Sequence, residues 1–160
     1  MDKPKTYTET EAERFFAIKF NGLTWGLLEK PDRTSLENEL LIDYAHASLA
    51  HWRTAGTPLH LQRGLWLLSR VYNVLGRVDS SLSFANRCQE VTLQHKDLML
   101  DFDLAYAFEA LARAHALAGK RSEAEKYLTL SREAGDLIRN EEDRMIFLGD
   151  LNGGNWHGLK

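Results

Sequence analysis

Residues Arg63 to Ala85 read RGLWLLSRVYNVLGRVDSSLSFA, two apolar-striped segments with a glycine between them. In the first segment large apolar residues recur at intervals of three and four, which is the period of one helix face. Gly76 can supply the positive backbone angle that commonly ends a helix. The stretch therefore predicts two antiparallel helices joined by a tight turn, which together make a helical hairpin.

The rest of the chain follows the same pattern. Proline occurs only at positions 4, 31 and 58, and no stretch alternates apolar and polar residues as a half-buried strand does. We therefore expect an all-α fold of about seven helices in one domain, residues 1–151. Its expected parts are hairpins over about 8–55, 58–93 and 101–138, a terminal helix over 141–151 and a flexible tail over 152–160, where glycines gather.

Capping side chains precede several of these segments, because a hydroxyl or carboxylate can accept a hydrogen bond from an amide that the helix leaves unpaired. The expected caps are Thr34 or Ser35, Thr57 before Pro58, Asp79 or Ser80, and one of Asp97, Asp101 and Asp103.

The hairpin turns recur at a nearly constant interval. They fall near Pro31, Gly76 and Gly119, which are 45 and 43 residues apart. When the two glycines are aligned, Leu65-x-x-Leu68-Ser69-x-x-Tyr72 lies over Phe108-x-x-Leu111-Ala112-x-x-His115, and Ser81-x-x-x-Ala85-x-x-Cys88 lies over Ala124-x-x-x-Leu128-x-x-Ser131. Small residues let paired helices approach, and large residues fill the space between neighbouring pairs. The interval predicts a stack of hairpins.

This order of large, leucine, small and tyrosine, followed past the turn by small, large and small, resembles the tetratricopeptide repeat. Arg63 to about Ser131 carries two such units, whose period exceeds the family's ~34 residues and which lack its terminal proline. KPDRT at 30–34, HWRTAGTP at 51–58 and DFDLAYAFEALARAHALAG at 101–119 resemble small bacterial proteins of this type that have no assigned activity. The resemblance implies a right-handed superhelix of stacked hairpins and names no function.

In the tetratricopeptide family the first helix of each pair faces a concave groove. The positions that match are Arg63, Trp66, Arg70 and Asn73 in one unit and Tyr106, Glu109 and Arg113 in the next. Arg70 and Arg113 are equivalent, so we expect their guanidinium groups to grip a carboxylate together. Trp66 and Tyr106 offer the flat apolar surface that anchors a peptide. The resemblance thus implies a peptide-binding groove.

The same residues have two other interpretations. Glu109 and Arg113 are four apart and can form an ion pair on one helix, while Arg63 and Arg70 can reach Asp101 or Asp103 and tie neighbouring hairpins together. Alternatively, the polar residues of this region enclose a small-molecule pocket, lined by Arg63, Arg70, Asp103 and Glu109.

A further alternative is self-association, because a short stack of repeats exposes apolar surfaces at both ends. The residues expected in such a homodimer are Phe15, Phe16 and Trp25 at one end and Phe147 and Leu148 at the other.

Composition argues against several classes of function. A formal charge of -3 over 160 residues lacks the basic excess of a nucleic-acid-binding module, and no apolar run approaches the ~18 residues of a membrane span. Cys88 is the only cysteine, and MDKPKTYTETEAER at the start lacks the apolar core of a secretion signal. We expect a cytoplasmic protein that binds neither nucleic acid nor membrane.

Motifs for catalysis are missing from the sequence. It has no G-x-S-x-G, no phosphate-binding glycine loop and no histidine pair with metal spacing, since His46 and His51 are five residues apart. The expectation is therefore a non-catalytic scaffold without cofactor or metal. Its expected ligands are protein or peptide segments, including acidic or carboxylate-bearing ones.

Overall fold

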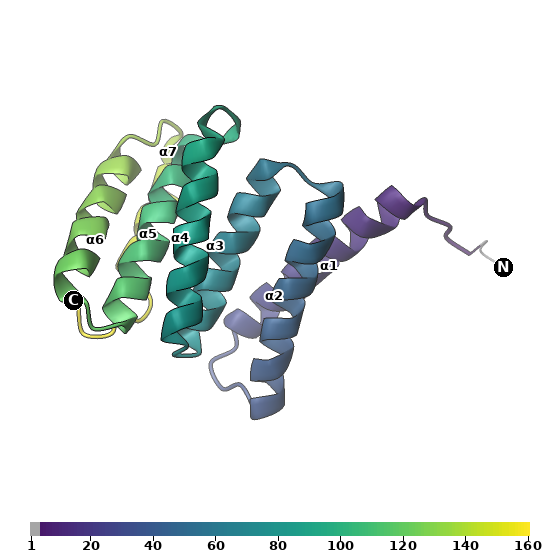
Figure 1. Ribbon diagram of the computed structural model, residues 1–160, viewed down its shortest axis with the longest axis horizontal. Coiled ribbons are helices and arrows are strands. Elements are labelled where there is room, and N and C mark those ends of the chain that lie inside the picture. The colour runs from purple at the N-terminus through teal and green to yellow at the C-terminus, as the bar shows by residue number, and fades with distance from the viewer. Residues whose placement is uncertain (1–3) are drawn as a thin grey trace.

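The computed structural model describes residues 4–160, which contain seven α-helices, one short 3₁₀ helix and no strand (Figure 1). The bounds are α1 Glu9–Leu28, α2 Ser35–Ala55, α3 Pro58–Val74, α4 Val78–Gln94, η1 Lys96–Leu98, α5 Asp101–Leu117, α6 Arg121–Asp136 and α7 Glu141–Asn152. The expected all-α class and helix number are confirmed, and each expected helix overlaps an observed one.

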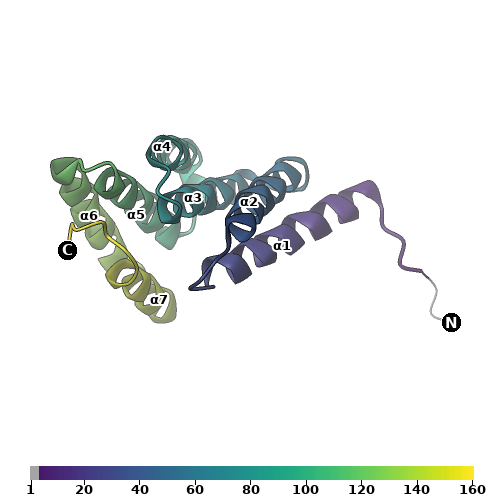
Figure 2. The ribbon, with the colours of Figure 1, turned by 90° about the horizontal axis from the view of Figure 1, so that it is seen from below.

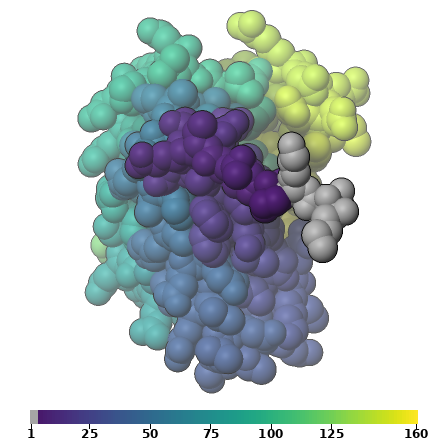
Figure 3. Space-filling view, turned by 90° about the vertical axis from the view of Figure 1, so that its right-hand side faces the viewer, coloured from purple at the N-terminus to yellow at the C-terminus, as the bar shows by residue number. Residues whose placement is uncertain are grey.

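The helices form three antiparallel hairpins that stack in chain order. α1 packs on α2, α3 on α4 and α5 on α6, while α2 meets α3, and α5 meets both α3 and α4. α7 rests on α5 and α6. In Figure 2, α4 lies on one side of α3 and α5, and α1 and α7 lie on the other. Figure 3 looks at the N-terminal end, where α1 lies across the front of the molecule.

The second and third hairpins turn in the same way. Gly76 and Gly119 both have a φ of 70°, the left-handed conformation that favours glycine. After each glycine, the next amide donates a hydrogen bond to a carbonyl five residues back, at 2.8 and 2.9 Å. The 43-residue interval of the sequence therefore separates two turns of the same geometry in the structure.

Several helix starts follow the expected capping chemistry. Thr34 caps α2: its hydroxyl accepts from the amide of Glu37, whose carboxylate accepts in return from the Thr34 amide at 2.8 Å. Thr8 and Glu11 repeat this arrangement at α1. Thr57 is the N-cap residue of α3, where its amide donates to Nδ1 of His60 at 3.1 Å.

Two other starts differ from the sequence-based expectation. α4 begins with Arg77 as N-cap and no capping side chain, so the expected cap at Asp79 or Ser80 is wrong. Only Arg77 lies between the turn glycine Gly76 and α4, and its side chain accepts no hydrogen bond from the helix. At α5 the N-cap is Leu100, and the Asp103 carboxylate reaches back to accept its amide at 2.9 Å.

Small residues bring the paired helices together in the core. Ser69 and Ser81 are buried and exchange hydrogen bonds, each hydroxyl donating to the other's carbonyl at 3.0 and 3.2 Å. Ala112 and Ala124 are fully buried at the equivalent places of the third hairpin. Cys88 is fully buried too, and burial raises the pKa of its thiol, as expected of a core residue.

The last residues pack against the helices instead of forming the flexible tail expected over 152–160. Trp156 is 3% exposed, and its indole N–H donates to the carbonyl of Leu151 at 3.2 Å. Gly154 has a φ of 74° and turns the chain back after α7. The glycines that suggested mobility therefore make a tight turn. We call residues 153–160 the C-terminal segment.

Candidate functional site

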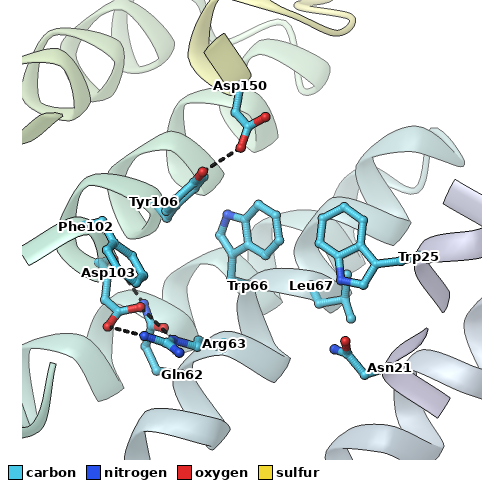
Figure 4. A pocket seen from close by; sticks show the side chains of 10 residues that line it. All are labelled: Asn21, Trp25, Gln62, Arg63, Trp66, Leu67, Phe102, Asp103, Tyr106 and Asp150. Carbon is cyan, nitrogen blue, oxygen red and sulfur yellow. Dashed lines mark hydrogen bonds and ion pairs between the residues drawn. The ribbon is translucent and has the colours of Figure 1, made fainter. Parts of the chain in front are cut away.

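One hollow of the molecule lies between the first helices of the three hairpins and α7. It measures about 340 Å³. Its lining comes from α1, α3, α5 and α7, as Figure 4 shows: Asn21, Trp25, Gln62, Arg63, Trp66, Leu67, Phe102, Asp103, Tyr106 and Asp150. We call this hollow the aromatic pocket. Matching side chains from successive hairpins do face one shared space.

Aromatic rings form one wall of this pocket. The rings of Trp25 and Trp66 stack at 5.9 Å between centroids, and Tyr106 meets Trp66 edge-on at 5.3 Å. Hydrogen bonds hold two of them, because the Trp66 indole donates to Glu109 at 3.0 Å and the Tyr106 hydroxyl donates to Asp150 at 2.5 Å. Trp25 is 38% exposed. The wall is therefore held in place and accessible.

Arg63 lines the pocket while paired within the protein. Its Nε and Nη2 donate to the two carboxylate oxygens of Asp103 at 3.0 and 3.2 Å, and its guanidinium lies 5.1 Å from the ring centroid of Phe102. The Arg63 side chain is still 43% exposed. Both interpretations of Arg63 apply: it ties α3 to α5, and it presents its outer edge to the pocket.

Arg113 is buried and fully engaged. Its Nε donates to the carboxylate of Glu109, and its terminal nitrogens donate to the carbonyls of Asp150 at 2.8 Å, Gly153 at 3.0 Å and Asn155 at 3.3 Å. The guanidinium also lies 4.0 Å from the ring centroid of Trp156. At 2% exposure it cannot meet a ligand. The expected joint grip of Arg70 and Arg113 on a carboxylate is therefore not formed here.

Asn73 and Glu109 are also buried, and both form hydrogen bonds within the protein. The Asn73 amide donates to the carbonyl of Arg113 at 2.9 Å, and its oxygen lies 2.9 Å from Nε2 of His157. Glu109 accepts from Trp66 and Arg113. The C-terminal segment thus occupies the part of the expected groove where Asn73 and Arg113 lie. Of the predicted groove residues, Arg63, Trp66, Arg70 and Tyr106 keep exposed surface at the hollows.

Arg70 lines a second, smaller hollow of about 150 Å³ next to the aromatic pocket. The two hollows share Trp25, Trp66 and Asp150. Within residues 4–160, no hydrogen bond or ion pair joins Arg70 to another side chain or carbonyl. Burial lowers the pKa of the Arg70 guanidinium, and the nearby charge of Arg113 lowers it further. Arg70 is therefore a partly buried cation without a direct partner.

Gly154 explains how two guanidinium groups come so near each other. A Cβ at this position would lie 3.0 Å from Nη2 of Arg70 and 3.0 Å from Nη1 of Arg113. The φ of 74° at this position is one that favours glycine, and any other residue would also press its Cβ tightly against the two arginine side chains. The backbone of the C-terminal segment thus lies directly against both arginines.

Six lining residues escaped the sequence-based prediction of the site: Asn21, Trp25, Gln62, Leu67, Phe102 and Asp150. Trp25 was assigned to a dimer surface, although an aromatic residue on the first helix of the first hairpin fits the groove equally well. Asp150 lies on α7, outside the repeated units, so no repeat spacing points to it. Of the other proposed dimer residues, Phe15 and Phe16 are exposed, whereas Phe147 is fully buried against Tyr106.

Two further observations concern metals and membranes. Within residues 4–160, no three histidine, cysteine or acidic side chains gather as they would around a metal ion. None of the helices formed by those residues combines the length and apolarity needed to cross a bilayer.

Comparisons with protein-family models, with curated proteins and with solved structures find no match for this chain.

Proposed function

We propose that the protein is a non-catalytic scaffold that binds a peptide or a segment of another protein on the face formed by α1, α3, α5 and α7. One observation carries the proposal: four helices, one from each hairpin and α7, contribute side chains to a single open pocket. A surface built jointly by successive hairpins can follow a chain running across them.

The chemistry of the pocket suits an anchor side chain. Tryptophan, tyrosine and arginine dominate the energetically important positions of protein interfaces, and Trp25, Trp66 and Tyr106 stand together here. A cavity of about 340 Å³ has room for about ten water molecules, so a large side chain that enters it displaces several of them. We expect a bound segment to insert an aromatic or large aliphatic residue.

Because Arg113 and Glu109 are buried, fewer groups can bind the acidic ligand expected from the sequence. Arg113 and Glu109 satisfy each other, so only Arg63 and Arg70 offer donors to an acidic segment. Arg63 already shares its charge with Asp103. An acidic group on the ligand is therefore expected at Arg70 alone.

A display selection of random peptides against the purified protein tests this function. Peptides from the selection should share a large apolar residue, and Trp25→Ala and Trp66→Ala should each weaken their binding by about tenfold or more. Trp52→Ala serves as the matched control, because Trp52 stacks on His60 outside the pocket. Recovery of peptides whose affinity survives both pocket variants would refute the proposal.

The size of the pocket also supports a second candidate, a small-molecule-binding protein. Ligand sites commonly measure about 300–1,000 Å³ and combine apolar walls with a few polar groups. The aromatic pocket lies at the lower end of this range and carries the Arg63–Asp103 pair and Asp150. Thermal shift assays with a panel of metabolites check this candidate, and the absence of any stabilising compound counts against it.

A further inference from the structure

Six charged side chains line the aromatic pocket and the neighbouring hollow: Arg63, Arg70, Asp103, Glu109, Arg113 and Asp150. Four of them form two ion pairs inside the protein, Arg63 with Asp103 and Arg113 with Glu109. The opposite charges within each pair neutralise each other, so these pairs attract a further ion only weakly.

Arg70 and Asp150 are the two charges left over. Within residues 4–160, Arg70 has no hydrogen-bond partner, and no ion pair joins it to Asp150. The Asp150 carboxylate accepts one hydrogen bond, from the uncharged hydroxyl of Tyr106 through Oδ2. One cation and one anion therefore line the same hollow without direct charge partners.

The aromatic wall adjoins both charges. Trp25 and Trp66 line the larger pocket and the smaller hollow alike, and Asp150 does so as well. Arg70 and Asp150 both line the smaller hollow beside these rings, so a ligand with its flat group against the rings has both charges next to it. A carboxylate and an ammonium group carried by one carbon match this arrangement of charges.

We propose that the two hollows together bind a free aromatic amino acid, with its side chain in the aromatic pocket, its carboxylate on Arg70 and its ammonium on Asp150. The inference rests on the small-molecule candidate above and names its ligand class. Free amino acids satisfy all three features at once, whereas an internal peptide residue carries neither charge on its main chain.

The cost of the unpaired arginine supports this assignment. Burial and the charge of Arg113 disfavour the charged form of Arg70 by more than the nearby carboxylates of Glu109 and Asp150 favour it, so the pKa of Arg70 is lowered in the folded protein. Evolution tends to tolerate such strain where a ligand relieves it. A bound carboxylate would supply the missing partner, and the charge of Arg70 would then be compensated.

Three probes of matched shape test the proposal: L-phenylalanine, 3-phenylpropionate, which lacks the ammonium group, and 2-phenylethylamine, which lacks the carboxylate. Calorimetric titration at concentrations up to about 10 mM gives their affinities. We expect L-phenylalanine to bind the wild-type protein about tenfold or more tightly than either partial probe, because each lacks one charge-assisted contact.

Two charge-neutralising variants locate the contacts. Arg70→Gln should bring L-phenylalanine and 2-phenylethylamine to similar affinities, since the carboxylate has lost its partner. Asp150→Asn should do the same for L-phenylalanine and 3-phenylpropionate, and it keeps an oxygen for the Tyr106 hydroxyl. Arg121→Gln is the matched control, because Arg121 is an exposed arginine on α6 that pairs with Glu125.

The outcomes separate this inference from the functions on which it builds. If none of the probes binds, the amino-acid site fails, while the small-molecule candidate is still judged by the metabolite panel and the peptide proposal by its own selection. If all three probes bind alike, or if neither variant changes their order, the pocket binds small aromatic molecules but the roles of Arg70 and Asp150 are wrong.

Discussion

The inner faces of α3 and α5 carry equivalent residues but meet different neighbours. Arg70 and Arg113 stand 43 residues apart at the same place in successive hairpins. Arg113 is covered by α7 and the C-terminal segment and donates to four oxygens, whereas Arg70 lines an open hollow and has no such bond within the described residues 4–160. The same repeat position is thus part of the framework in one hairpin and available for a ligand in the other.

The elements that pack against α5 account for this difference. α7 and the C-terminal segment supply the carbonyls of Asp150, Gly153 and Asn155, and each satisfies a donor of Arg113. Among residues 4–160 no carbonyl accepts a hydrogen bond from Arg70, although a Cβ at Gly154 would lie 3.0 Å from both guanidinium groups. The surface of α3 and α5 that can meet a ligand is therefore the part that α7 and the C-terminal segment leave uncovered.

Neutralising each arginine in turn tests whether Arg70 and Arg113 differ in their contribution to stability. Arg113→Gln leaves the buried Glu109 carboxylate without its cation and should lower the free energy of unfolding by about 3–5 kcal/mol. Arg70→Gln removes a charge that burial and Arg113 disfavour, so it should leave stability unchanged or higher. Urea denaturation of both variants measures this difference, and equal losses would mean that Arg70 too is part of the framework.

The turns provide a smaller test of the equivalence of the two hairpins. Gly76→Ala and Gly119→Ala place a Cβ at a φ of 70°, where L-residues are strained, and no other group lies within 4 Å of that Cβ. Each variant should lose about 1 kcal/mol. Thermal unfolding should give nearly equal losses, and one glycine that tolerates alanine would show that its turn is not under the same constraint.

The smallest expected effect concerns His157, which helps to cover Asn73. Burial lowers the pKa of His157, and the charges of Arg113 and Arg70 lower it further. The unfolded chain therefore binds the proton more readily than the folded one. The stabilising contribution is complete above pH 6.5, the ordinary value, and is lost as the pH falls towards the lowered pKa.

A pH series of melting temperatures for wild type and His157→Asn measures this contribution. The variant should lose less stability than the wild type when the pH falls from about 7.5 to about 5. Identical pH profiles would show that His157 does not help to hold the C-terminal segment in place.

Local chemistry made most of the fold predictable from the sequence. The apolar stripe of α3, the turn glycines Gly76 and Gly119, and the capping pair Thr34 and Glu37 each act over a few residues, so they are legible in one chain. The start of α4 was misplaced by two or three residues because its glycine turn leads into the helix without a side-chain cap.

The candidate site was less predictable, because it depends on contacts between distant parts of the chain. Repeat spacing correctly brought Arg63, Trp66 and Tyr106 to one hollow. It could not indicate that Trp156 would pack on Arg113, or that Asp150 would accept the Tyr106 hydroxyl, since α7 and the C-terminal segment follow no repeat. The glycines of that segment suggested flexibility, whereas the packing of Trp156 determines its course.

The central claim is that ligands bind where the first helices and α7 meet, and the four tryptophans report on it directly. In a two-dimensional ¹H–¹⁵N spectrum each indole N–H gives its own signal, and a peptide from the selection can be titrated into the labelled protein. We predict that the indole signals of Trp25 and Trp66 shift together while those of Trp52 and Trp156 stay in place. Binding that moves Trp52 or Trp156 and leaves Trp25 and Trp66 unchanged would contradict it.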